Sequence, residues 1–404
     1  MLTARGRGFV VGAFVSVVAA HVLTFPTLNY VASLLVGLVV CASIFVFAGH
    51  SRVHIARTFA PDVVAQGQPS SATVTFTNLS ALPSLEAQWE DQLPVGIVGE
   101  SRGVLHALGG GHGLNARTRF AYTIHGVRRG SHPIGPLTVK VPDPFGLVYR
   151  QHTFGEPQSL IVLPKRVELS DISFGGANIA GATRPAPQHV GVGDDDIIAR
   201  SYLPGDALRR MHWKATAHRG VLMVRQEEQR NNPEATVLLD LDAFGQGTVR
   251  DSQGEWEYSA SFEWAVVAAA SVSVHLVRRG YFVNVITPGG PVQRSIADGL
   301  DTIDDVMTDL AIIEPTEVTA EAIAGIAPSE RPVVAILGRL DEERAATWSR
   351  LNSSTGLVFV AVGTPQPALE ILAGAGWKCR TYKAGDDIAD LWLDLDARDF
   401  HAAR

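Results

Sequence analysis

Residues 8–25 read GFVVGAFVSVVAAHVLTF, and residues 30–49 read YVASLLVGLVVCASIFVFAG. Neither run contains Asp, Glu, Lys or Arg, and the short stretch Pro26-Thr27-Leu28-Asn29 separates them. Each run is long enough to cross a hydrocarbon core of about 30 Å as a helix, and lipid cannot hydrogen-bond a bare backbone. The sequence therefore predicts a transmembrane helical hairpin over residues 1–52.

Basic residues flank this hairpin at its outer ends. Arg5 and Arg7 precede the first run, Arg52 and Arg57 follow the second, and the connecting loop has no Lys or Arg. The positive-inside rule then places both ends of the hairpin in the cytoplasm. We therefore expect a cell-membrane protein with two spans and cytoplasmic soluble domains.

Two other interpretations of the apolar runs stay open at this point. A cleaved signal peptide fits the basic start, but a second apolar run directly after the first does not fit it. A core hairpin of a water-soluble domain is disfavoured, because two uncharged runs of this length are rare in such domains.

The composition of the whole chain is that of a folded protein. Its 404 residues predict two or three domains, and 46% of them are hydrophobic. The net charge of −7 argues against nucleic acid as the main partner. A disulfide between Cys41 and Cys379 is implausible because Cys41 lies in an apolar run, and no Cys/His cluster indicates zinc.

Residues 53–165 show the period of two that is typical of half-buried antiparallel strands. The alternating residues are Ala72, Val74 and Phe76, then Phe120, Tyr122 and Ile124, and then Leu137, Val139 and Val141. Turn signals separate the runs, including three glycines at 109–111 and Pro142-Asp143-Pro144. The pattern predicts an all-β, sandwich-like domain.

Residues 166–196 are predicted to be a linker, and residues 197–404 to be an α/β domain. Short apolar runs predict strands at 237–239, 282–286, 333–337 and 357–362, and helical patterns lie around 256–276, 303–310, 341–351 and 368–372. This alternation predicts a parallel sheet that is covered on both faces. Ligands of such sheets bind beyond the carboxyl ends of the strands.

A charged, aromatic-bearing motif precedes the first of these strands. Its candidate structural or partner-binding residues are Arg200, Tyr202, Pro204, Gly205, Asp206, Arg209, Trp213, Lys214, Arg219 and Arg225. The basic residues could bind phosphate, but a salt-bridged packing cluster is the favoured interpretation. We expect Trp213 to be packed and the charged residues to be paired around it.

The pattern R-x-Y-x-P-G-D-x-x-R-x-x-x-W-K-x-x-A-x-R over residues 200–219 resembles the domain-of-unknown-function 58 (DUF58) family. Arg129-Gly130, Gly135-Pro136 and Asp143-Pro144-Phe145-Gly146-Leu147 also resemble that family. The resemblance implies a C-terminal half similar to von Willebrand factor A domains. It also implies a MoxR-type AAA+ ATPase as partner, in a chaperone-like or assembly role.

A von Willebrand A domain binds a divalent metal through Asp-x-Ser-x-Ser after its first strand, whereas this chain has Asp240-Leu241-Asp242-Ala243-Phe244. Phe supplies no oxygen, so Asp240, Asp242 and Asp341 are candidate ligands of a degenerate magnesium or calcium site. The alternative is a carboxylate pair that caps a helix or pairs with an arginine. Apart from this metal, no cofactor is expected. The run Asp194-Asp195-Asp196 is interpreted as a solvated acidic turn.

Two functions follow from these features. The favoured one is a membrane-anchored binding or scaffold protein, because the chain has no G-x-S-x-G elbow and no other catalytic constellation. The alternative is a metal-dependent hydrolase that uses Asp240 and Asp242 at the sheet end. The sequence thus favours a protein that is not an enzyme.

Overall fold

The computed structural model describes residues 1–48, 53–81, 83–110, 113, 115–172, 197–201, 211, 213–227, 233–289, 293–296, 300–329, 331–352 and 356–397. The chain divides into two compact units. The first unit contains Met1–Val167 and Asp304–Glu314, and the second contains Glu168–Ile303 and Pro315–Arg404. Most of the predicted linker, with Asp194-Asp195-Asp196, lies outside the described residues.

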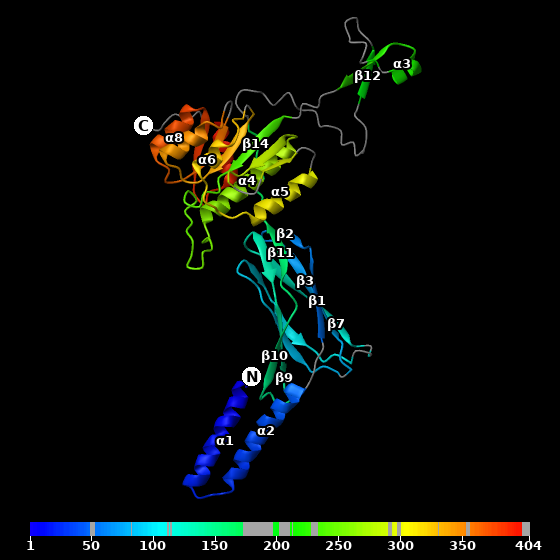
Figure 1. Ribbon diagram of the computed structural model, residues 1–404, viewed down its shortest axis with the longest axis vertical. Helices are drawn as coiled ribbons and strands as arrows, with labels where there is room; N and C mark the ends of the chain where they lie inside the picture. Colours follow the sequence, from blue (N-terminus) through cyan, green and yellow to red (C-terminus); the bar gives the residue numbers. More distant parts are fainter. Residues whose placement is uncertain are drawn as a thin grey trace. The chain divides into compact units, whose positions relative to one another are not determined.

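The two N-terminal apolar runs form the predicted pair of helices, α1 (Ala4–Val22) and α2 (Leu28–Ala48), which lie side by side in Figure 1. The buried residues of α1 are Gly6, Ala13 and Ala20, so a narrow face of small residues is covered at a spacing of seven. Small residues allow close approach of helix backbones in membranes. Both helices are long and apolar enough to span a membrane.

A third helix, α4 (Ala260–Arg278), also meets the length and hydropathy expected of a span. Unlike α1 and α2, most of its surface is buried within the protein, where it packs against the strands of the C-terminal sheet. Its apolar character is therefore explained by burial in the core of the second unit.

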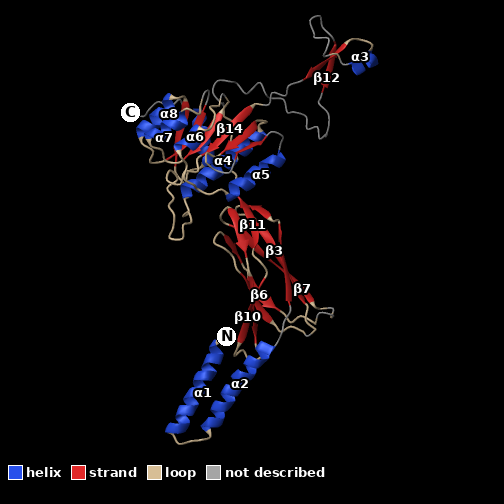
Figure 2. Ribbon diagram, in the orientation of Figure 1, coloured by secondary structure: helices blue, strands red, loops and turns tan. Residues whose placement is uncertain are grey.

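Apart from the helical segment Asp304–Glu314, the rest of the first unit is built from strands, shown in red in Figure 2. They are β1 (Val53–Ala60), β2 (Val63–Ala65), β3 (Pro69–Asn78), β4 (Ala87–Asp91), β5 (Ile97–Gly99), β6 (Arg102–Leu105), β7 (Arg117–Gly126), β8 (Gly130–Ile134), β9 (Leu137–Pro142), β10 (Tyr149–Phe154) and β11 (Gln158–Leu163). Their sheets have the orders β1-β3-β7-β5, β10-β9-β4-β6 and β2-β11-β8.

These sheets share one hydrophobic core. The alternation seen in the sequence is the burial pattern of the strands, with Val74 and Phe76 of β3 fully buried beside Ile124 of β7 and Leu137 of β9. Trp89 of β4 stacks on Phe120 of β7 with ring centroids 4.2 Å apart. The prediction of half-buried antiparallel strands in this segment is confirmed for these pairs except β2 with β11, which is parallel.

The second unit carries an α/β region. Its strands are β14 (Glu234–Leu239), β15 (Phe282–Ile286), β16 (Gln293–Ile296), β17 (Val333–Leu337), β18 (Gly356–Ala361) and β19 (Trp377–Tyr382). Besides α4, its helices are α6 (Ala320–Ala324), α7 (Glu342–Ser349), α8 (Gln366–Gly374) and α9 (Ile388–Ala397), while α5 (Leu300–Ile312) crosses the boundary between the residue ranges of the two units.

The sheet of this region has the order β16-β15-β14-β17-β18-β19. Its strands are parallel except for β16, which pairs antiparallel with β15 at the edge. All described side chains of β17 and β18 are buried, as expected for strands covered on both faces. The predicted parallel sheet is therefore confirmed, with an antiparallel edge strand that the sequence analysis missed.

The first and last residues of the central motif, Arg200 and Arg225, lie in a two-stranded sheet. Strand β12 (Ile197–Ser201) pairs antiparallel with β13 (Met223–Glu227), and the short helix α3 (Trp213–Arg219) precedes β13. Between them, residues 202–210 and residue 212 are outside the description.

Candidate functional site at the sheet end

The strand order changes direction between β14 and β17, since β15 lies on one side of β14 and the later strands lie on the other. Ligands of open α/β sheets bind at such a switch point, beyond the carboxyl ends of the strands. Asp240 and Asp242 directly follow β14, and Gly338, Arg339 and Asp341 follow β17. The structure thus brings the three predicted carboxylates to the part of the sheet where a site is expected.

The two loops at the switch point are in direct backbone contact. The amide of Arg339 donates to the carbonyl of Gly245 over 2.7 Å. A Cβ atom added at Gly338 would lie 2.6 Å from the carbonyl carbon of Gly245, closer than real contacts allow. Glycine at 338 therefore lets the loops close over the end of the sheet, as a close backbone approach requires.

Arg344 of α7 faces the aspartate pair beneath these loops. Its Nη1 lies 3.0 Å from Oδ1 of Asp242, and its Nη2 lies 4.0 Å from Oδ1 of Asp240. Asp341 does not join them, because its carboxylate accepts the Arg344 amide over 2.8 Å as the N-cap of α7. This arrangement matches the alternative interpretation of the carboxylates, namely an arginine pair and a helix cap.

The donors of Arg344 are incompletely satisfied. Its Nε and Nη2 atoms are buried and have no hydrogen-bond partner among the described residues. Buried polar groups are almost always paired, so each exception in a native structure calls for an explanation. The sequence analysis missed this residue, because only the pairing of β17 with β14 brings the start of α7 to the aspartates.

Asp240 is the most deeply buried member of the site. It is fully buried, and its carboxylate accepts the amides of Asp242 at 3.1 Å and Gly338 at 3.4 Å. Burial raises the pKa of Asp240 to about 6, although Arg344 lowers it. Perturbed pKa values of this kind are enriched at functional sites.

The geometry does not assemble a metal-binding set. Among the described residues, no group of three or more His, Cys, Asp or Glu side chains lies close enough to hold a metal ion. The Arg344 guanidinium already supplies positive charge to Asp242, and Asp341 points to the α7 amide. A substrate would also have to reach an Asp240 carboxylate that is fully buried in this conformation.

Above the buried pair, the site presents an aromatic and a cationic side chain. Phe244 is 74% exposed, and the guanidinium of Arg339 lies 5.3 Å from its ring centroid. The same loop is anchored from below by Gln246, whose Nε2 donates to the Asp240 carbonyl and whose Oε1 accepts from Ser261 and Tyr382. A rigid loop that exposes a large aromatic residue is suited to contact another molecule.

The central motif is only partly visible in the described residues. Arg200 lies opposite Val224, and Arg225 opposite Ala199, in the β12–β13 pair. Lys214 and Arg219 belong to α3, while Tyr202, Pro204, Gly205, Asp206 and Arg209 lie outside the description. The structure therefore does not show the expected charge pairs of the motif.

The expectation that Trp213 is packed is wrong. Its side chain is 67% exposed. The reason is that α3 has seven residues and packs beside β13, a member of a two-stranded sheet that offers little apolar surface. The indole is thus presented outward and not used as core.

Two further family-like stretches have structural roles within the first unit. Nη1 of Arg129 donates to the carbonyls of Leu310, Ala311 and Ile313 at the end of α5, over 2.9–3.0 Å. Such contacts satisfy carbonyls that a helix end leaves unpaired. Gly135 approaches Arg57, and a Cβ there would lie 2.9 Å from its guanidinium nitrogens.

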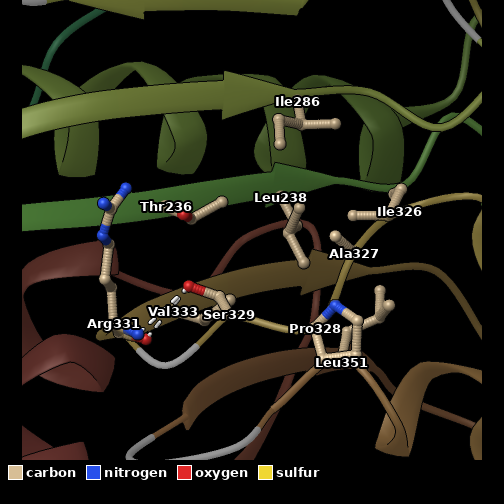
Figure 3. Close-up of a pocket in the computed structure, with 10 residues that line it drawn as sticks. All are labelled: Thr236, Leu238, Ile286, Ile326, Ala327, Pro328, Ser329, Arg331, Val333 and Leu351. Carbon is tan, nitrogen blue, oxygen red and sulfur yellow. Dashed lines mark hydrogen bonds between the residues drawn. The ribbon is translucent and has the colours of Figure 1, made fainter.

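A cavity of about 310 Å³ lies elsewhere in the second unit, between strands β14, β15 and β17 and the loop that follows α6. Figure 3 shows Thr236, Ser329, Arg331 and Val333 toward one end of the cavity and most of its aliphatic residues toward the other. Arg331 is already paired with Glu234. The cavity therefore has a mixed polar and aliphatic lining, and its arginine is already used in an ion pair.

The fold and the site define a class of protein with two membrane-length N-terminal helices, several β-sheets and a C-terminal α/β region with a parallel sheet. Residues 198–350 match the family model described as Protein of unknown function DUF58. This range begins in β12 and ends after α7, so it contains the central motif and the sheet-end site.

Individual relatives are distant. The uncharacterized protein YeaD of Bacillus subtilis (strain 168) is 26% identical over 175 residues, which cover 43% of this chain and 44% of that protein. The chain thus matches less than half the length of this curated relative.

Solved structures resemble parts of the chain weakly. A CARDB domain from Pyrococcus furiosus gives a TM-score of 0.20 at 13% identity, covering 28% of this chain and 89% of the domain. A GAE domain from Saccharomyces cerevisiae gives 0.18 at 12% identity, covering 27% and 91%. Scores this low carry no argument about this protein.

Proposed function

We propose that this protein is a membrane-anchored binding or scaffold protein whose helical hairpin holds the β-rich part of the first unit and the second unit on the cytoplasmic side. The observation that carries the binding role is the closed sheet end, where Phe244 and Arg339 are presented above a buried Asp240–Asp242–Arg344 group. A closed, rigid surface with an exposed aromatic residue suits a macromolecular partner better than a small substrate.

We further propose that the α/β region is a degenerate von Willebrand A-like domain. In support, the aspartates follow the first strand of a sheet whose third strand in chain order is an antiparallel edge. Arg344 stands beside the carboxylates where that class of domain would use a metal, so binding here would not depend on one. The partner proposed from the family resemblance is a MoxR-type AAA+ ATPase, in a chaperone-like or assembly role.

The alternative, a metal-dependent hydrolase, has the raised pKa of Asp240 in its favour. Against it stand the burial of that carboxylate, its Arg344 neighbour and the use of Asp341 as a helix cap. Calorimetry with magnesium, calcium and manganese separates the two proposals. Millimolar metal should give no binding signal, whereas a signal that is lost in D240A would favour the hydrolase.

Membrane topology tests the anchoring part of the proposal. A reporter that works only in the cytoplasm should be active when fused after Arg57 and inactive when fused at Asn29, because the basic residues lie at the outer ends of the hairpin. An extracytoplasmic signal from the Arg57 fusion would overturn the orientation, and with it the cytoplasmic partner.

Co-purification tests the partner. The tagged full-length protein, crosslinked mildly in its native membrane and then purified, should recover an AAA+ ATPase. Repeated recovery of the protein without any ATPase would count decisively against this partner.

A further inference from the structure

The turn at residues 143–148, between β9 and β10, is held rigidly by the Asp143 side chain. This carboxylate is buried and accepts the amides of Phe145 at 2.7 Å and Val148 at 2.5 Å, while the Gly146 amide donates to the Asp143 carbonyl. The Asp143 carboxylate therefore stabilises the backbone of the turn.

The turn is fastened to the start of α1. Thr3, the N-cap of α1, donates its hydroxyl to the Gly146 carbonyl over 2.6 Å, and its amide donates to the Leu147 carbonyl over 2.9 Å. In the first turn of the helix, a Cβ added at Gly6 would collide with the Leu147 carbonyl oxygen. Glycine at position 6 thus allows the turn to touch the helix backbone.

This contact fixes the level of the turn along the hairpin. Helix α1 has 19 residues, so its length is about 28 Å, close to the ~30 Å of a hydrocarbon core. If α1 spans the membrane, its first turn lies at the membrane surface, and the turn that packs on Gly6 lies there too. On its other side the turn reaches further along the hairpin, because Leu147 and Val148 form a small cluster with Ala42 of α2, against which Phe9, Leu38 and Val39 pack.

The side chains presented at this level have the chemistry of a membrane interface. Phe145 is 60% exposed although it belongs to a rigid turn, and Arg5 and Arg7 are exposed on the first turns of α1. Arg5 is also close to the turn, since its Nη1 would lie 3.9 Å from a Cβ on Gly146. Aromatic rings and basic residues are the side chains enriched at headgroup level.

We propose that the 143–148 turn is a second membrane contact, in which Phe145 enters the headgroup layer and Arg5 and Arg7 bind the phosphates of anionic phospholipids. The inference rests on the proposed span of α1, and it adds a lipid-binding surface to the strands of the first unit. These strands would then be attached to the bilayer in two ways, through the hairpin and through the 143–148 turn, and the two attachments together would set their orientation.

Site-directed fluorescence in reconstituted bilayers tests the contact. Cys379 is buried, so replacing Cys41 by alanine leaves no exposed thiol among the described residues. The full-length variants C41A/F145C, C41A/F14C and C41A/F244C each receive an environment-sensitive thiol dye. Phe14 is exposed in the middle of α1 and reports the span, and Phe244 is an exposed aromatic residue of the second unit.

The labelled proteins are placed in phosphatidylcholine bilayers with or without phosphatidylglycerol, and quenched by nitroxides on the lipid headgroup or deep in the acyl chain. The dye at position 145 should be quenched several-fold more by the headgroup nitroxide than by the deep one, and more strongly with phosphatidylglycerol. The dye at position 14 should respond to the deep nitroxide, and the dye at position 244 to neither.

Each contrary outcome has a distinct meaning. Quenching at position 14 without quenching at position 145 would overturn the second contact and leave the span intact. No quenching at position 14 would overturn the membrane span, and thus the proposed anchoring itself. Equal quenching at position 145 in both lipid compositions would overturn the assignment to anionic headgroups.

Discussion

Arg57 in the first unit and Arg344 in the second unit both face buried aspartates, but their surroundings differ. Arg57 donates through Nε and Nη2 to Asp91 at 2.9 and 2.7 Å, and through Nη1 to the Ile134 carbonyl. The Tyr122 hydroxyl also donates a hydrogen bond to the Asp91 carboxylate over 2.5 Å. Burial, together with the neighbouring Asp91, raises the pKa of Tyr122. Arg344 reaches one carboxylate at 3.0 Å, and two of its nitrogens have no hydrogen-bond partner in the part of the chain that the structure describes.

This difference in hydrogen bonding distinguishes an arginine–aspartate group that stabilises the fold from one that is available for function. A buried network in which every member is satisfied rigidifies a fold, whereas an incompletely satisfied one is a candidate for binding or regulation. Exposure agrees with this view, because the Arg57 side chain is 5% exposed and the Arg344 side chain 21%. We therefore assign Arg57 to the stability of the first unit, and we propose that Arg344 supports the Phe244 loop of the proposed partner surface.

The largest expected effect is that of breaking the satisfied pair. R57M leaves the Asp91 charge buried without its cation, which should cost about 3–5 kcal/mol in the first unit. Hydrogen exchange of peptides from β3 and β7, measured on the full-length protein, reports this loss. The matched double variant R57M/D91L should cost less than R57M alone, because no charge is left unpaired; a single variant as stable as the parent would refute the structural role.

A smaller effect is expected from protonation of Asp240. Its folded pKa of about 6 lies above its usual value, so folding favours the protonated form. The added stability should be fully present below about pH 4 and should disappear as the pH rises through 6. The shift of roughly two units corresponds to about 3 kcal/mol at most.

Comparison of the parent with D240N at each pH isolates this contribution. The difference in the opening free energy of β14 amides, measured by hydrogen exchange, should change between pH 4 and 7, because the amide of D240N cannot titrate. A pH-independent difference would show that Asp240 keeps an ordinary pKa.

The smallest expected change in stability is that of W213A. An exposed indole contributes little to folding, so the variant should lie within about 0.5 kcal/mol of the parent. The matched control is W264A, since Trp264 is buried, stacks on Tyr382 at 4.0 Å and donates to the Asp386 carbonyl; it should cost about 3–5 kcal/mol. Thermal melts compare the two, and equal losses would restore a packing role for Trp213.

Much of the fold could be predicted from local pattern. The sequence predicts β15 and β17 with the bounds that the structure shows. The signal is simplest for β17, whose continuous apolar run is buried on both faces. The antiparallel edge strand β16 was missed, since Gln293-Arg294-Ser295-Ile296 has no apolar run. Helix α9 was missed too, because the aspartates at 390, 394 and 396 interrupt its apolar pattern.

The site could be predicted only in part. Position after the first strand was sufficient to select Asp240 and Asp242. Their partner Arg344 lies about a hundred residues later and meets them because β17 pairs with β14, a long-range fact that local periodicity does not contain. Trp213 shows the opposite failure, in which a residue expected to be packed belongs to an element with too little apolar surface to cover it.

Site-specific photocrosslinking in native membranes tests the partner surface most directly. A photoreactive residue replaces Phe244 in the full-length protein, alone and together with R344M, and replaces the exposed Val95 of the first unit as a control. The account predicts that position 244 captures an AAA+ ATPase, that R344M reduces capture about tenfold, equivalent to ~1.4 kcal/mol, and that position 95 captures none. Absence of the ATPase from position 244, or capture that is equal from positions 244 and 95 and unchanged by R344M, would contradict it.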